Sequence, residues 1–183
     1  MNAPQAFLSV VSVFLCTLPG PVHSADRLDE NLRDPFEAQA QRTLLDWAAR
    51  LTGRTVTDDE PMPHSRSRPA GELMAQVCPE EPRKCRQLVA AYSIERREIL
   101  YRESLDPARV FDRSFLVHEY VHYLQHQDYG DQVNVSCQRI LDNEREAYAA
   151  QAAYLRRHNI RFPIGRALRG ARCPTSTPQV VRS

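Results

Sequence analysis

Apolar residues first recur at helical spacing between residues 35 and 51. Asp34 and Pro35 form a suitable N-cap and first-turn pair, and Gly53 follows as a stop signal. The apolar positions repeat at intervals of three and four residues: Phe36, Ala40, Leu44, Trp47, Ala48 and Leu51. This stripe predicts a helix that packs one face on the core.

A polar stretch and two short apolar runs come next. Asp58–Pro69 carries three prolines and few apolar side chains, which predicts a loop. The runs at 88–94 and 99–102 are rich in Val, Ile, Leu and Tyr, and four charged residues separate them. They predict a pair of β-strands.

The third part of the pattern is again helical. Asp112 or Ser114 can cap a helix that continues through Leu124 and ends before Gly130. A polar loop of about ten residues leads to a second helix from about Cys137 to about residue 158, which contains the Ala-rich stretch AYAAQAAYL. The pattern as a whole predicts a helix-dominated α+β domain.

The N-terminal residues predict export. Residues 1–25 contain no charged side chain, and residues 6–18 are nearly all apolar, too few for a bilayer span of about 20 residues. Helix breakers and the sequence Val22-His23-Ser24 follow, which suits cleavage before Ala25. We therefore expect a signal peptide at 1–24, with an uncleaved anchor as the alternative. Residues 25–183 then form one exported domain without a transmembrane span, periplasmic or secreted, most simply in a bacterial envelope.

The cysteines fit an oxidising compartment. Cys16 lies in the leader, which leaves an even number: Cys78, Cys85, Cys137 and Cys173. Four cysteines allow three pairings, of which we favour 78–85 and 137–173 because the first two flank a short Pro-rich loop. A zinc knuckle is the rival interpretation, but six intervening residues exceed the usual two to four.

Charge and composition exclude several classes. The chain has 183 residues, with 24 basic and 23 acidic side chains and a net charge of +1, which argues against a nucleic-acid-binding surface. A hydrophobic share of 42% is ordinary for a globular protein. No acidic residue follows Glu146, whereas seven arginines do: Arg156, Arg157, Arg161, Arg166, Arg169, Arg172 and Arg182. Such a run is usually a solvated face, and contact with an anionic surface is the functional alternative.

The chemistry is concentrated in His118-Glu119-Tyr120-Val121-His122, an HExxH motif. Residues four apart on a helix project from one face, so both imidazoles can hold one metal ion. Glu119 is rotated away from the metal by about 100° and is placed to act on a water as a general base. His126 is too far along the helix from His118 to bind the same ion, which indicates a surface or supporting role.

A catalytic zinc needs a third protein ligand, and the second helix offers two carboxylates. Glu144 shares a stripe with apolar residues, whereas Glu146 lies on a more exposed face where it can pair with a cation. An antiparallel arrangement also brings Glu144 to the height of His122. A buried carboxylate is costly unless it is paired or bound to metal, so we favour Glu144, with Glu146 in reserve.

HEYVHYLQ followed by EREAYAAQ resembles the zincin metallopeptidases whose third ligand is a Glu on the next helix, the gluzincin arrangement. The resemblance extends from Ser114 to about Leu155 and includes Glu144 and Ala147 at the spacing of that motif. Where many such families have Asp, this chain has Tyr148. It is similar to small exported bacterial HExxH proteins of unassigned substrate, and it implies a minimal zincin-like domain.

The resemblance implies one Zn²⁺ held by His118, His122 and Glu144, with Glu119 as the catalytic base in cleavage of a peptide or protein substrate. Tyr148, Tyr154, Tyr120 or His158 could stabilise the transition state, and an extended peptide could lie on the Ile99–Arg102 strand. The alternatives are an inactive metal-binding or interaction domain and a zinc amidase with a non-peptide substrate. Two His and a carboxylate also suit iron.

Overall fold

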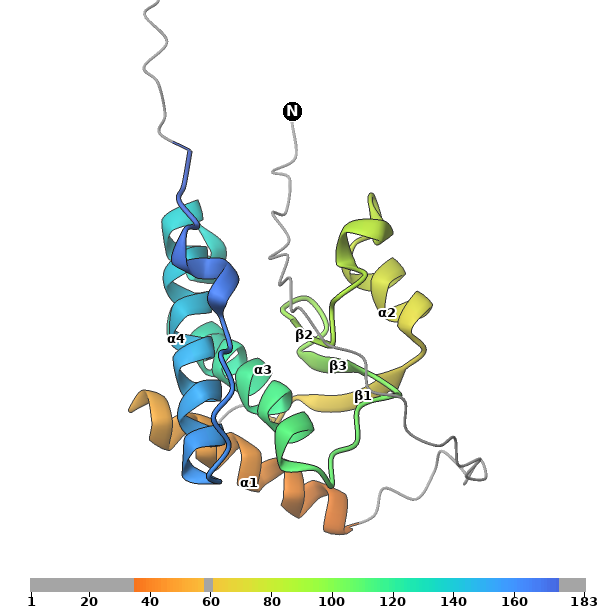
Figure 1. Ribbon diagram of the computed structural model, residues 1–183, viewed down its shortest axis with the longest axis vertical. Coiled ribbons are helices and arrows are strands. Elements are labelled where there is room, and N and C mark those ends of the chain that lie inside the picture. The colour runs from red at the N-terminus through yellow and green to blue at the C-terminus, as the bar shows by residue number, and fades with distance from the viewer. Residues whose placement is uncertain (1–34, 58–60, 175–183) are drawn as a thin grey trace, which may run out of the picture.

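The computed structural model describes residues 35–57 and 61–174 (Figure 1). The predicted signal peptide, the predicted cap Asp34, the side chain of Phe36 and residue Arg182 lie outside the described part. Within it the fold is the predicted helix-dominated α+β domain, with a helical layer, a small mixed sheet and a short helix beyond the sheet.

Three helices make up the main layer: α1 (Pro35–Thr52), α3 (Val110–Tyr129) and α4 (Cys137–Arg157). Helix α3 contacts α1, α4 and the sheet, and as a result it is buried on most of its surface, with Val117, Tyr120 and Leu124 fully enclosed. Helix α1 buries Leu44 and Ala48 against it, as the stripe predicts, and also Leu45, which the stripe does not include, whereas Ala40 is exposed. The HExxH motif therefore lies in the best-packed element of the described chain.

The sheet has the strand order β1-β3-β2, with β1 (His64–Arg68) parallel and β2 (Ala90–Ser93) antiparallel to β3 (Glu98–Arg102). Side chains alternate between its faces. Ile99 packs in the core with the three long helices, whereas Leu100 packs with Leu73 of helix α2 (Ala70–Val77). The sheet is thus covered on both sides.

Two expectations about the strands are wrong. Residues 64–68 form strand β1 and not a loop, because their backbone pairs residue for residue with β3 while most side chains stay exposed. An edge strand can carry polar residues, so its sequence reads as a loop. Strand β3 is central, flanked by β1 and β2, and offers no free edge to a peptide.

Helix α4 begins where the sequence predicts, whereas helix α3 begins earlier than predicted. Ser136 caps α4, where its Oγ accepts the Arg139 N–H at 3.2 Å. Helix α3 begins at Val110, before both predicted caps, and its N-cap residue Arg109 makes no side-chain cap. Asp112 instead accepts the Asp106 N–H at 3.0 Å. The 3₁₀-helix η2 (Gly130–Asn134) occupies the loop between the long helices.

Both predicted disulfides are present. Cys78–Cys85 joins the end of α2 to the 3₁₀-helix η1 (Pro82–Cys85), and Cys137–Cys173 ties the start of α4 to the C-terminal segment. That segment returns along α4 and contains the 3₁₀-helix η3 (Arg166–Arg169) (Figure 1). Of the helices in the described residues, none combines the length and apolarity needed to cross a bilayer.

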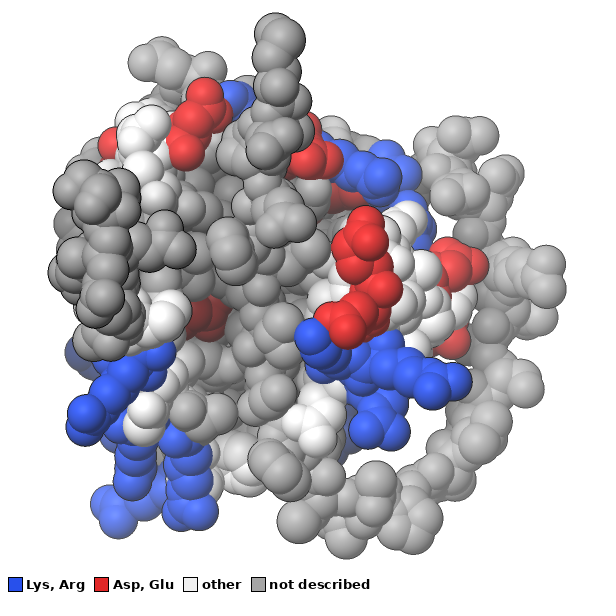
Figure 2. Space-filling model, turned by 90° about the horizontal axis from the view of Figure 1, so that it is seen from above, with Lys and Arg blue, Asp and Glu red and all other residues white. Residues whose placement is uncertain are grey.

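The arginines beyond Glu146 are solvent-exposed wherever the structure describes them: Arg156, Arg157, Arg161, Arg166, Arg169 and Arg172. Figure 2 shows one group of basic side chains at the lower left, the side on which α4 and the C-terminal segment lie in Figure 1, and another right of centre. A solvated basic margin accounts for them, and contact with an anionic surface stays a prediction.

Candidate metal centre

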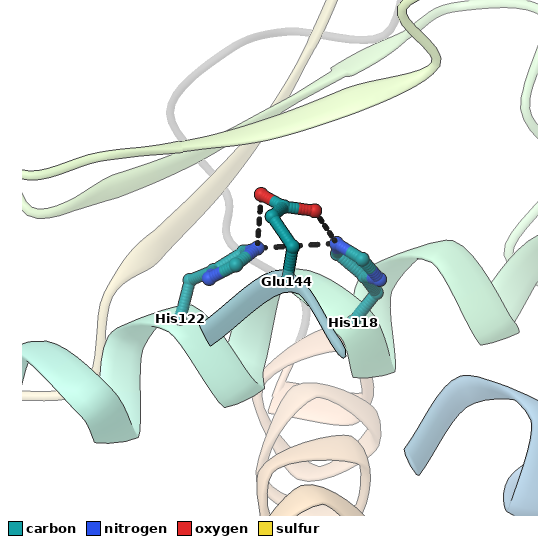
Figure 3. A group of neighbouring side chains, drawn as sticks. All are labelled: His118, His122 and Glu144. Carbon is teal, nitrogen blue, oxygen red and sulfur yellow. Dashed lines mark hydrogen bonds and ion pairs between the residues drawn. The ribbon is translucent and has the colours of Figure 1, made fainter. Parts of the chain in front are cut away.

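His118 and His122 project from the middle of α3 toward Glu144 of α4 (Figure 3). Their Nε2 atoms are 3.1 Å apart. Glu144 Oε2 lies 3.6 Å from His118 Nε2, and Glu144 Oε1 lies 3.3 Å from His122 Nε2. Because α3 and α4 pack side by side, the helix turn that carries the histidines meets the turn that carries Glu144.

This arrangement fits a tetrahedral metal ion. Two ligand atoms at zinc bond lengths of about 2.0–2.1 Å in a tetrahedron are about 3.3 Å apart, close to the separation of the two Nε2 atoms and to the shortest distance from each to a Glu144 oxygen. The two histidines are nearest to different oxygens of that carboxylate. The His118 and Glu144 side chains are 4% and 6% exposed, and that of His122 is 18% exposed. Glu144 Oε2 is buried without a hydrogen-bond partner among the described residues, as expected for an oxygen that needs a cation. His118, His122 and Glu144 could therefore hold a metal ion.

The charges at the centre are strongly coupled. Burial alone would lower the pKa of His122, but the Glu144 carboxylate, together with Glu119, raises it to about 9. Burial would raise the pKa of Glu144, but His122 and His118 hold it well below its usual range. Without a metal, the carboxylate is thus ionised and His122 carries a proton at neutral pH.

Glu119 lies next to this group and faces the sheet. Its Oε2 accepts the Tyr92 backbone N–H of β2 at 2.8 Å, which anchors the carboxylate to the strand. Burial raises the pKa of Glu119, and the nearby His118 and His122 oppose that shift. A carboxylate with a raised pKa is a better proton acceptor than an exposed one.

A cavity of about 380 Å³ opens onto the centre and is lined by Glu119, His122 and Glu144. The end of α2 and strand β2 line one side of it, and η2 and the start of α4 line the other. Much of the lining is apolar, including Val77, Leu88, Val133 and Ile140. His122, Glu144 and Glu119 are therefore accessible to a molecule larger than water.

Tyr148 lies on the His118 side of the centre. Its ring packs edge-on against that imidazole with centroids 4.5 Å apart, and it lines a much smaller cavity with His118 and Glu119. Burial, with the Glu144 and Glu119 carboxylates, raises the pKa of its phenol, so the hydroxyl keeps its proton. Its role as a transition-state donor stays a prediction.

The other candidate donors lie elsewhere. Tyr154 packs on Trp47 and His158, with ring centroids 5.5 and 4.6 Å away. The Tyr120 hydroxyl lies 3.3 Å from Ser65 Oγ of β1. These contacts place Tyr154 and His158 among the helices and Tyr120 under the sheet.

The structure separates the two candidate third ligands. Glu146 forms an ion pair with Arg54, with 2.7 Å between Oε2 and Nη2, as expected for a carboxylate on the more exposed face. His126 is buried and not on the surface, and its Nδ1 lies 2.9 Å from the Tyr92 hydroxyl. Neither belongs to the group that could hold the ion.

Two residues around the centre were not predicted from the sequence. Gln125 Oε1 lies 2.9 Å from His122 Nδ1, and Gln125 Nε2 donates to Glu146 at 2.8 Å. Arg54 reaches Glu146 from the loop after α1. Gln125 follows His122 by three residues, a spacing that places both on one helix face and could have indicated it.

Comparison of the chain with protein-family models, with curated proteins and with solved structures found no match.

Proposed function

We propose that the protein is an exported zinc-dependent hydrolase that cleaves peptide bonds. The observation that carries the proposal is the convergence of His118, His122 and Glu144 at ligand separations, with Glu119 in the same cavity. Three protein ligands and an accessible fourth side are the requirements of a catalytic zinc site, whereas a structural site is closed by a fourth protein ligand.

A zinc ion in such a site supplies a Lewis acid that makes water acidic enough to lose a proton near neutral pH. Glu119 is the residue that accepts this proton and later passes it to the leaving amine. Its contact with the Tyr92 N–H holds one carboxylate oxygen on β2. That N–H points away from β3, so the outer edge of β2 borders the cavity, and an extended peptide would pair there.

The two disulfides support the exported location in the proposal. Cys78–Cys85 and Cys137–Cys173 would persist in the periplasm or outside the cell and would be reduced in most cytosols. A peptide substrate there would reach the site through the cavity between β2 and α4.

The test is cleavage of a broad peptide library by the zinc-loaded protein, with Glu119→Gln as the matched control. We expect the wild type to cut and the variant to lose about 10²- to 10⁴-fold in rate, because it keeps the ligands and lacks the base. Equal cleavage by both would refute the role of Glu119. A wild type that cuts no peptide but hydrolyses non-peptide amides would favour the amidase, and one inert to both would favour the metal-binding domain.

A further inference from the structure

Gln125 is fully buried beside His122 and uses both ends of its amide. Its Oε1 lies 2.9 Å from His122 Nδ1. Its Nε2 donates to two acceptors on α4, the Asn143 carbonyl oxygen at 3.0 Å and Glu146 Oε2 at 2.8 Å. The amide thus connects the candidate ligand His122 to Asn143 and Glu146, which precede and follow the candidate ligand Glu144 on α4.

The surroundings allow only one orientation of this amide. A backbone carbonyl only accepts hydrogen bonds, and so does an ionised carboxylate. Both oxygens of Glu146 act as acceptors here, because Arg54 Nε and Nη2 donate to Oε1 and Oε2 at 3.2 and 2.7 Å. A rotated amide would place Gln125 Oε1 against two acceptors, so Nε2 faces α4 and Oε1 faces His122.

This orientation determines which nitrogen of His122 is protonated. Gln125 Oε1 can only accept, so His122 Nδ1 must carry a hydrogen and donate it. In the neutral imidazole the lone pair then lies on Nε2, the atom 3.3 Å from Glu144 Oε1 and 3.1 Å from His118 Nε2. A histidine metal ligand typically depends on such an outer partner for its tautomer and ring orientation.

We propose that Gln125 is the positioning residue that makes His122 a metal ligand, and that Glu146, held by Arg54, fixes the Gln125 amide. The inference rests on the metal centre of the proposed function but not on turnover. It assigns a role to the carboxylate that competed with Glu144: Glu146 acts on the metal through Gln125 and His122.

Arg54 extends this connection across three elements. From the loop after α1 it contacts Asp128 of α3 and Glu146 of α4, and its Nη2 donates to the Tyr129 hydroxyl at 3.2 Å. The same side chain therefore ties the helix with the histidines to the helix with Glu144. His118 has no equivalent partner, since its buried Nδ1 has no hydrogen bond with any described residue.

The experiment measures the zinc dissociation constant of folded protein by competition with a chelator. Gln125→Leu should bind zinc about 10- to 100-fold more weakly, the usual cost of losing an outer partner of a ligand. Gln127→Leu is the matched control, because Gln127 lies on the same helix but bonds to Thr57 and Tyr123, and it should keep the wild-type affinity. The cobalt-loaded protein adds a second readout, because its visible spectrum reports the coordination geometry and should change in Gln125→Leu alone.

An exchange of the two side chains distinguishes positioning from a structural role and covers the case in which Gln125→Leu does not fold. Gln125→Glu alone should weaken zinc binding strongly, because two carboxylates would face each other. Combined with Glu146→Gln it should recover part of the affinity, because the new amide can donate to the new carboxylate, which still accepts from His122, whereas the Asn143 carbonyl oxygen stays without its donor.

Three outcomes overturn the inference. Gln125→Leu could bind zinc as tightly as the wild type, or the exchanged pair could bind no better than Gln125→Glu. A wild type that binds no zinc would overturn the metal centre as well. A wild type that binds zinc but cleaves nothing would remove the proposed peptidase and leave this inference to be decided by the affinities.

Discussion

Zinc binding should displace a proton from His122. In the metal-free protein the Glu144 and Glu119 carboxylates raise the pKa of His122 to about 9 in spite of its burial. Gln125 accepts from Nδ1 in either state, so the proton that leaves is the one on Nε2. The metal and this proton compete for one atom.

The size of the effect follows from the pKa. A pH of 7 lies about two units below the pKa of His122. At about 1.4 kcal/mol per unit, deprotonation of His122 at this pH costs about 3 kcal/mol. The apparent zinc affinity should therefore fall about tenfold for each pH unit below about 9, until other groups titrate. Close to one proton should leave His122 for each zinc bound at pH 7.

Calorimetric titration with zinc in two buffers of different ionisation enthalpy, both at pH 7, measures this proton. The difference between the two binding enthalpies should correspond to release of at least about one proton by the wild type and by His64→Asn, a change at an exposed position in β1. Enthalpies that do not depend on the buffer would show that His122 is already neutral, and would refute the coupling between His122 and the two carboxylates.

Three further predictions concern the site and its frame. Tyr148→Phe should leave zinc content and KM unchanged and lower kcat about 100-fold if the phenol stabilises the transition state, and an unchanged kcat would exclude that role. Replacing both Cys137 and Cys173 by Ser should lower the free energy of unfolding by about 4 kcal/mol in chemical denaturation, because the disulfide closes a loop with a separation of 36 residues, and an unaltered midpoint would contradict this. In the metal-free protein Glu144 has a lowered pKa and His122 a raised pKa, because the two form an ion pair. This ion pair should stabilise the fold most between about pH 4.5 and 6.5. The melting temperature should fall as the pH drops below this window or rises through about 9, whereas Glu144→Gln should lose this dependence.

The convergence of His118, His122 and Glu144 could be predicted from the sequence because its signals are local. The spacing of His118 and His122 fixes their common face once a helix forms, and the apolar stripe around Glu144 distinguishes this carboxylate from Glu146 on the more polar face. The short connection between the two helices makes them antiparallel neighbours, which brings the third donor to the pair.

The parts of the fold that could not be predicted depend on distant pairing. Strand β1 forms because β3 offers it a backbone partner, although its own side chains are polar. Arg54 is separated from Glu146 by 92 residues, so its contact depends on how α1 packs against α3 and α4. Strand β3 is central because β1, which precedes α2 in the chain, pairs with it on the side opposite β2. No local pattern in the sequence shows this pairing.

The metal centre itself can be tested by the zinc affinity of the wild type and of Glu144→Ala, with Asp142→Ala as the control on the exposed face of the same helix. We predict about one zinc per chain for the wild type and for Asp142→Ala. For Glu144→Ala we predict a loss of affinity greater than the roughly 100-fold that removal of an outer partner costs. A Glu144→Ala variant that binds zinc as tightly as the wild type, or a wild type that binds none, would contradict the metal centre.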